Sequence, residues 1–125
     1  MKVMIFVLAL CLTQYAVGAT TNHAVLFIDS ARPEQAAMIE ALNSAFFFSA
    51  SLRAGLKVTA YDINTDTTHR GFSGDVDYRR DFDGKAVAQM RPGALPYLFC
   101  LRGGQRIVRQ LTIGSQEEIK LCLGS

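Results

Sequence analysis

A proline at the start of an apolar run, followed by a double-glycine turn and a second apolar run, most constrains the fold of this chain. The first run is Tyr97–Leu101, directly after Pro96, and the second is Ile107–Ile113. Two such runs joined by a few residues that include Gly103 and Gly104 predict a β-hairpin. Pro96 fits the start of the first strand, because that position needs no backbone N–H for the ladder.

The N-terminal half predicts a strand, a long helix and a second strand. Ala24–Ile28 is a continuous apolar run, typical of a strand that is buried on both faces of a sheet. Glu34–Leu52 has apolar residues at helical spacing, and Asp29 or Ser30 is suited to cap its start. Lys57–Ile63 is the next expected strand. A strand, a helix and a strand with short joins predict a parallel βαβ unit.

The middle and the end of the chain complete this pattern. Thr67–Asp83 is polar and rich in Gly, Asp and Arg, so we expect a long loop there, and its acidic residues fit no calcium-binding loop. Gly84–Met90 is a short helix candidate. Ser115 and Glu118 form a predicted capping box at the start of a last helix, Ser115–Leu123. The fold class is therefore α/β, with a central mixed sheet and helices on both faces.

Composition and the N-terminal segment limit where this protein functions. The chain has 125 residues, is half apolar and carries a formal charge of +2, which argues against disorder and against a strongly electrostatic nucleic-acid binder. In residues 1–19, Lys2 precedes an apolar stretch, Val3–Leu12, that is too short to span a bilayer. We expect a signal peptide that is cut after Ala19, with an uncleaved anchor as the alternative. Residues 20–125 then form one periplasmic or secreted domain with no membrane span.

The order of elements resembles thioredoxin over residues 23–123. Leu95–Phe99 resembles the strand of that family that begins at a cis-proline, and Gly103–Gln105 resembles its hairpin turn. Val58–Asn64 is similar to its central strand, and Gln110–Gly114 to its final strand. The resemblance implies a thioredoxin-like fold, a cis Leu95–Pro96 bond and a proline that faces the family's active site.

The chain departs from this family at the active site itself. Thioredoxins carry Cys-x-x-Cys at the start of the first long helix, whereas the matching segment here, Ser30–Ala36, has no cysteine. The chemistry needs a thiolate activated by a helix N-terminus and a second thiol that resolves the mixed disulfide. We therefore expect a redox-inactive protein, with no catalytic residue, no cofactor and no metal.

Two cysteines remain after the signal peptide, Cys100 and Cys122. Export implies an oxidising compartment, in which a disulfide between them is allowed. The sequence does not fix which sheet face Cys100 occupies, so a disulfide and two buried thiols both stay open. An alternative function also depends on this cysteine: a thiol-dependent oxidoreductase or peroxidase relative that uses Cys100.

The favoured function is a non-catalytic binding or assembly protein of the bacterial envelope. Phe27–Glu34 is similar to the strand-to-helix junction of exported accessory proteins in conjugative transfer and secretion systems, and this similarity implies a protein or peptide partner. In the thioredoxin family, the face beside the cis-proline receives extended polypeptide. The residues expected on that face are Ser30, Arg32, Pro33, Glu34, Leu95, Pro96 and Tyr97.

Three consecutive aromatic residues, Phe46–Phe48, offer a second surface. They span most of a helical turn, so at least one should point away from the main core. A neighbouring element covers it, or it forms a surface for a partner.

Overall fold

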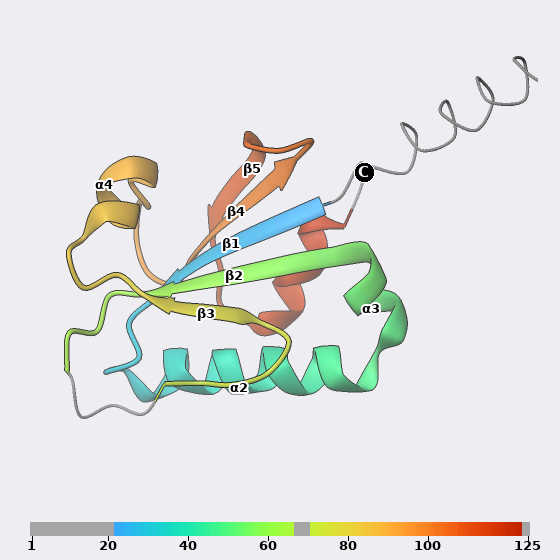
Figure 1. Ribbon diagram of the computed structural model, residues 1–125, viewed down its shortest axis with the longest axis horizontal. Helices are drawn as coiled ribbons and strands as arrows, with labels where there is room; N and C mark the ends of the chain where they lie inside the picture. Colours follow the sequence, from blue (N-terminus) through green and yellow to red (C-terminus); the bar gives the residue numbers. More distant parts are fainter. Residues whose placement is uncertain (1–21, 67–70, 124–125) are drawn as a thin grey trace, which may run out of the picture.

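The computed structural model describes residues 22–66 and 71–123, which form one five-stranded sheet with helices on both faces (Figure 1). The expected signal segment, residues 1–19, lies outside the described residues. The strands are β1 (Asn22–Ile28), β2 (Leu56–Asp62), β3 (Asp77–Arg80), β4 (Tyr97–Arg102) and β5 (Arg106–Thr112). The helices are α2 (Pro33–Phe48), α3 (Ala50–Gly55), α4 (Lys85–Met90) and the 3₁₀-helix η1 (Gln116–Cys122).

The sheet is mixed, and its strand order is β3-β2-β1-β4-β5. Strand β1 pairs in parallel with β2 and antiparallel with β4. Strand β3 is parallel to β2, and β5 is antiparallel to β4. The expected α/β class, the βαβ unit and the C-terminal β-hairpin with its following helix are confirmed.

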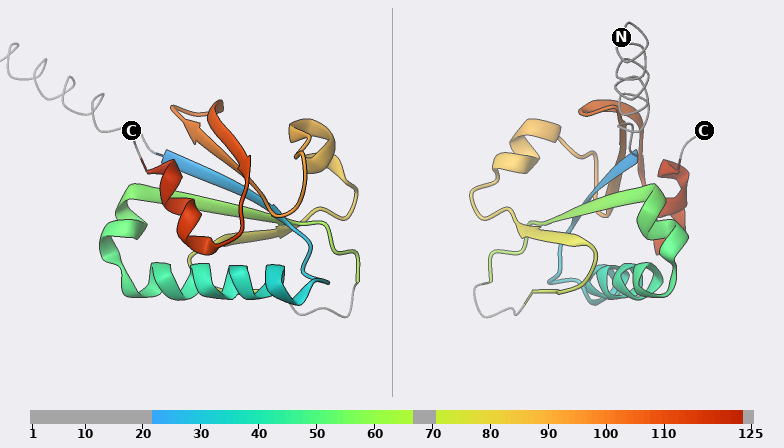
Figure 2. Two further views of the ribbon diagram at one scale, coloured as in Figure 1. Left: turned by 180° about the vertical axis from the view of Figure 1, so that it is seen from behind. Right: turned by 45° about the vertical axis from the view of Figure 1, so that its right-hand side comes forward.

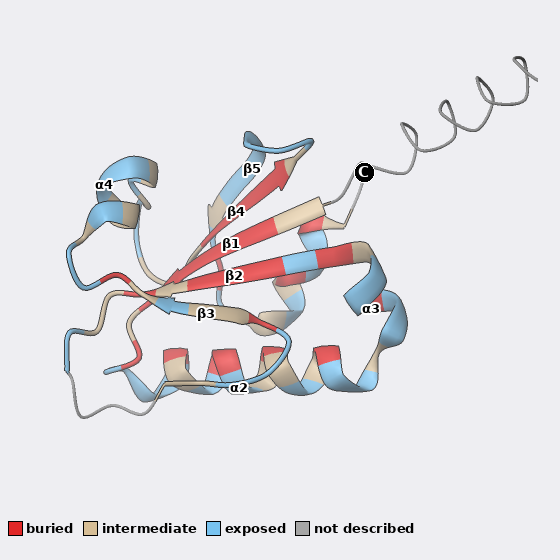
Figure 3. Ribbon diagram, viewed as in Figure 1, coloured by how far each residue is buried: buried red, intermediate tan, exposed pale blue. Residues whose placement is uncertain are grey.

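Alternate residues of the central strands pack into two separate cores. Figure 3 shows β1, β2 and β4 as largely buried along their length. Leu26 and Leu98 face α2 and η1, where they pack with Leu42 and Ile119. Residues of the opposite parity face α4, where Phe27 and its neighbours form a smaller cluster. Figure 2 shows the two layers edge-on, with α4 on one side of the sheet and α3 and η1 on the other. This arrangement explains why β1 is apolar throughout.

The expected loop Thr67–Asp83 contains a strand that the sequence does not reveal. Strand β3 pairs with the end of β2, from Thr59 opposite Asp77 to Asp62 opposite Arg80. Its four residues, Asp-Tyr-Arg-Arg, show no apolar alternation, because an edge strand of this length packs few side chains into a core. Residues 67–70 of the expected loop lie outside the described residues.

The expected helix Glu34–Leu52 is two helices, and its expected cap is wrong. Ser49 adopts an extended conformation after α2, and its hydroxyl accepts the N–H of Leu52 at 3.1 Å, which starts α3. At the other end the cap position is Arg32, which makes no side-chain capping hydrogen bond. Asp29 instead accepts the N–H of Ala31 within the turn at 3.0 Å.

The capping box at the last helix is confirmed. The Ser115 hydroxyl accepts the N–H of Glu117, and the Glu118 carboxylate accepts the N–H of Ser115, both at 3.1 Å. The helix itself is 3₁₀ in type, and it contacts α2, β1 and β4. In the described part of the chain, no helix has both the length and the apolar character to cross a membrane.

Candidate functional site

A buried carboxylate lies at the carboxyl ends of the parallel strands β1, β2 and β3. Asp62, the last residue of β2, has no exposed surface. Its Oδ1 accepts the backbone N–H groups of Ser30 and Asn64, each at 3.0 Å. Its Oδ2 accepts a 2.5 Å hydrogen bond from the Tyr78 hydroxyl in β3. The Asn64 amide also donates to the Ser30 hydroxyl at 2.9 Å, so residues from three segments form one network.

Hydrogen bonds keep Asp62 charged despite its burial. Burial is the largest single influence on this group, and by itself it disfavours the carboxylate. The hydroxyls of Ser30 and Tyr78 and the backbone N–H groups of Ser30 and Asn64 act in the opposite direction, and together they lower the pKa of Asp62. Asp62 is therefore ionised in the folded protein. Its hydrogen bonds connect the turn after β1 with the end of β2 and with Tyr78 in β3.

Tyr78 is expected to ionise at unusually high pH. Burial, and then the hydrogen bond to the Asp62 carboxylate and its charge, raise the pKa of Tyr78 to about 12. Because a raised pKa favours the neutral hydroxyl, its contribution to stability is complete below the unfolded value of about 10 and is lost as the pH rises through about 12. Titration of tyrosinate absorbance should show a last step that Tyr78→Phe removes.

The control for this titration is Asp62→Asn, which removes the charge with little change in size. In this variant the Tyr78 step should move down toward the ordinary tyrosine value. A last step that stays in place without the Asp62 charge contradicts the assignment of the network.

The turn between β1 and α2 lies beside the start of β4. Phe27 pairs with Tyr97 in the β1–β4 ladder, so Ile28 and Pro96 are the next positions outward. The Leu95–Pro96 bond is cis, as expected. Leu95 and Tyr97 pack against the cluster on the α4 face, and this packing anchors the segment. The two segments expected to form the binding face are therefore neighbours, at the end of β1 and the start of β4.

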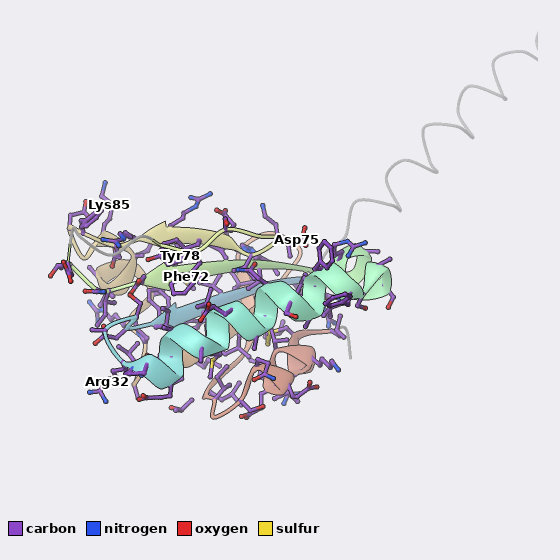
Figure 4. The ribbon with its side chains drawn as sticks, turned by 90° about the horizontal axis from the view of Figure 1, so that it is seen from below. Arg32, Phe72, Asp75, Tyr78 and Lys85 are labelled. Carbon is purple, nitrogen blue, oxygen red and sulfur yellow. A yellow bond between two sulfur atoms is a disulfide. The ribbon has the colours of Figure 1, made fainter. Side chains whose placement is uncertain are left out.

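The expected binding residues divide into exposed, half-buried and buried positions. The exposed ones are Arg32, Pro33 and Glu34, and the half-buried ones are Leu95, Pro96 and Tyr97. In Figure 4, Arg32 projects from the start of α2, away from the rest of the protein. Ser30, expected on the same face, is only 8% exposed, because it is bonded to Asp62 and Asn64 beneath the turn. It is a positioning residue for the turn and not a contact surface.

Cys100 and Cys122 form a disulfide, with their Cα atoms 5.0 Å apart. Cys100 lies on the face of β4 that η1 covers, together with Leu98, and this position settles the strand parity that the sequence left open. The two residues are 1% and 4% exposed. In this state neither sulfur is available as a thiolate.

Two acidic residues of the expected loop, Asp81 and Asp83, stabilise the start of α4. Asp81 accepts the N–H groups of Ala86 and Val87, at 2.9 and 3.1 Å, and so caps α4 from four positions before its first residue, Lys85. Asp83 accepts the N–H of Lys85 at 3.1 Å. Within residues 22–66 and 71–123, no three His, Cys, Asp or Glu side chains are grouped as a metal site requires.

The aromatic run at the end of α2 divides between core and surface. Phe46 is buried in the main core, whereas Phe47 and Phe48 are 69% and 80% exposed and pack edge-to-face at 5.0 Å. The expectation that at least one of the three points outward is confirmed. No element in the described part of the chain covers the outer pair.

Comparison with known proteins supports the architecture. No protein-family model and no curated protein sequence matches this chain. The crystal structure of StoA from Bacillus subtilis is similar, with a TM-score of 0.61 and 12% identity over 82% of this chain and 81% of that chain. The chain has a thioredoxin-like fold. Conserved protein BF1870 of unknown function, from Bacteroides fragilis, gives a TM-score of 0.50 and 16% identity over 79% and 77% of the two chains.

The turn between β1 and α2 contains no cysteine and lies beside the cis-proline, Pro96. Below it lies the Asp62 network, which the sequence analysis missed. The sequence signal for this network is Asp62, an acidic residue at the end of a buried strand. Its partner Tyr78, however, comes from β3, the strand that the sequence did not reveal.

Proposed function

We propose that this protein is an exported, redox-inactive thioredoxin-like binding protein that serves as an accessory of a conjugative transfer or secretion apparatus in the bacterial envelope. One observation carries the proposal. The turn beside Pro96 has the thioredoxin-like position but presents Ala31, Arg32, Pro33 and Glu34 in place of thiols. A surface that keeps its location and lacks its redox groups is suited to bind without reacting.

The proposed binding surface is the set of exposed and half-buried residues at this edge: Arg32, Pro33, Glu34, Leu95, Pro96 and Tyr97. It combines charges of both signs on the turn with apolar surface at the start of β4. An extended segment of a partner protein suits such a surface, because backbone hydrogen bonds supply affinity and flanking side chains supply selectivity. The hydrogen bonds of the Asp62 network fix the position of the turn relative to the sheet.

The disulfide and the N-terminal sequence support export. Structural disulfides persist in oxidising compartments and are rare in the cytosol. Cys100 and Cys122 are paired and buried, and residues 1–19 have the pattern of a cleavable signal. The same pairing argues against a reductase or peroxidase that uses Cys100, because thiol chemistry requires an accessible thiolate.

Site-specific crosslinking tests the binding surface. A photoreactive amino acid at Arg32 or Ala94, both exposed near Pro96, should crosslink to a partner protein in the cells that produce this chain. Glu40, exposed further along α2, is the matched control position and should give little product. Identification of the captured protein by mass spectrometry should reveal a component of an envelope transfer or secretion apparatus. Crosslinks that form from Phe48 and not from Arg32 or Ala94 would reject the assigned surface.

A redox assay tests the second half of the proposal. The purified protein should not accelerate the reduction of insulin by dithiothreitol above the uncatalysed background. Turnover that Cys100→Ser abolishes would instead establish the thiol-dependent alternative.

A further inference from the structure

The sheet ends in a long exposed strand. Strand β5 has β4 on one side, and within the described residues no strand pairs with its other side. Six of its seven residues are exposed, and its apolar residues Ile107 and Val108 are 43% and 46% exposed. Figure 1 shows this strand at the end of the sheet opposite β3. Its outer backbone N–H and C=O groups are a template on which another strand can pair.

The charged residues of β5 itself are all basic. Between Gly84 and Gln116 the sequence contains no Asp or Glu, and its basic residues are Lys85, Arg91, Arg102, Arg106 and Arg109. Two of these arginines lie in β5 itself, and both are exposed. Within the described part of the chain, the side chains of Arg106 and Arg109 make no hydrogen bond and no ion pair. The opposite edge differs, because there Asp77 forms an ion pair with Arg79 at 2.9 Å.

The two faces of β5 have different chemistry. The ladder places Arg109 opposite Cys100, so its side chain is on the face that α2 and η1 cover. A β-bulge at Val108 shifts the register, so Ile107 is opposite Leu101 and lies on the other face, the α4 face. There both residues help to line a groove of about 540 Å³. A strand that is added beside β5 would place alternate side chains next to Arg109 and next to Ile107.

We propose that the β5 edge binds an extended polypeptide segment in which acidic residues alternate with apolar ones. The acidic side chains lie on the face of Arg106 and Arg109, and the apolar side chains lie on the face of Ile107, beside the groove. Backbone hydrogen bonds to the free edge of β5 provide the pairing, and the arginines select the charge. This surface is separate from the one beside Pro96, so the two can be tested independently.

A second copy of this chain is a poor occupant of the same edge. Antiparallel pairing of two β5 strands about their middle residue sets Arg109 against its own copy. Like charges directly opposite each other on neighbouring strands are destabilising. The arginines therefore disfavour self-association and favour an acidic partner.

A charge-swap experiment tests the proposal. The probe is a capped nonapeptide that alternates glutamate with valine, titrated calorimetrically against the folded protein, with a lysine–valine peptide as the control. The acidic peptide should bind, and R106E/R109E together should weaken it about tenfold and permit binding of the lysine peptide. Arg32→Glu, which makes a single charge reversal beside Pro96, should leave the affinity unchanged. Because all three arginines are exposed, unchanged thermal midpoints should verify that the variants fold.

Amide hydrogen exchange provides the structural readout. On addition of the acidic peptide, backbone amides of Arg106–Thr112 should gain protection, since strand pairing protects N–H groups that charge attraction alone leaves exposed. Absence of binding, binding without this protection, or binding that the double reversal leaves intact would each overturn the proposal. Weakening by Arg32→Glu alone would move the peptide to the Pro96 surface. A concentration-dependent dimer in sedimentation would show that a second copy occupies the edge.

Discussion

Replacing Asp62 by alanine is expected to lower the free energy of unfolding by about 4 kcal/mol. The carboxylate is fully buried and accepts hydrogen bonds from Ser30, Asn64 and Tyr78. Its removal leaves these buried and part-buried donors without their acceptor, and each buried orphan costs about 1–3 kcal/mol before relaxation. Urea unfolding followed by circular dichroism measures the loss.

Two further variants separate the network from a general effect of substitution. Asp83→Asn changes an exposed acidic residue that makes one hydrogen bond, so it should cost less than about 1 kcal/mol. A double-mutant cycle of Asp62→Asn with Tyr78→Phe should show coupling, because the first change removes the charge on the acceptor and the second removes the donor of the same 2.5 Å contact. Additive effects in that cycle would contradict the contact.

The Asp62 carboxylate should also affect how the stability of the protein depends on pH. Because the pKa of Asp62 is lowered in the folded state, its contribution is present above the unfolded value of about 3.9 and is lost as the pH falls through the folded value. Asp62→Asn should therefore remove part of the loss of stability on the acid side. A variant whose acid unfolding matches the parent protein would show that this carboxylate is not held ionised.

Breaking the disulfide is expected to cost about 3 kcal/mol in the free energy of unfolding. The two cysteines are separated by 22 positions, and the crosslink restricts the unfolded chain over that loop. The bond also fastens η1 to β4, so its loss should loosen the C-terminal segment first. The test compares unfolding midpoints of the oxidised protein, the reduced protein and the double variant Cys100→Ala/Cys122→Ala.

Mass spectrometry of the unfolded and alkylated protein checks the bond directly. Without reductant, neither Cys100 nor Cys122 should be modified, and with reductant both should be. Two modified cysteines in the absence of reductant would exclude the disulfide. Equal stability of the oxidised and reduced proteins would show that the crosslink restricts little in the unfolded chain.

Most of the fold was predictable, because its signals are local. The hairpin depends on Pro96 and on Gly103 and Gly104, all within one short stretch. The capping box of the last helix depends on Ser115 and Glu118, which are three positions apart. Such signals can be recognised without knowledge of distant partners. The break at Ser49 was missed, because a serine inside an apolar pattern is compatible with a continuous helix.

The binding surface was only partly predictable. The sequence identifies the Ser30–Glu34 turn and the Leu95–Tyr97 segment, because both lie at recognisable element boundaries. It does not reveal that Ser30 is buried under the turn. That fact depends on Asp62, which is 32 positions away and meets Ser30 only when β1 and β2 pair.

The sequence by itself determined the order of the elements apart from β3 and the break between α2 and α3. It also determined the absence of cysteines from the turn before α2 and the concentration of basic charge after Gly84. Tertiary structure alone decided that β3 joins the sheet, that Cys100 faces Cys122 and that Tyr78 reaches Asp62. The physical reason is the two-residue period of a strand: a shift of one position in the pairing moves every side chain to the other face. That register is set by packing between distant segments, and no local pattern encodes it.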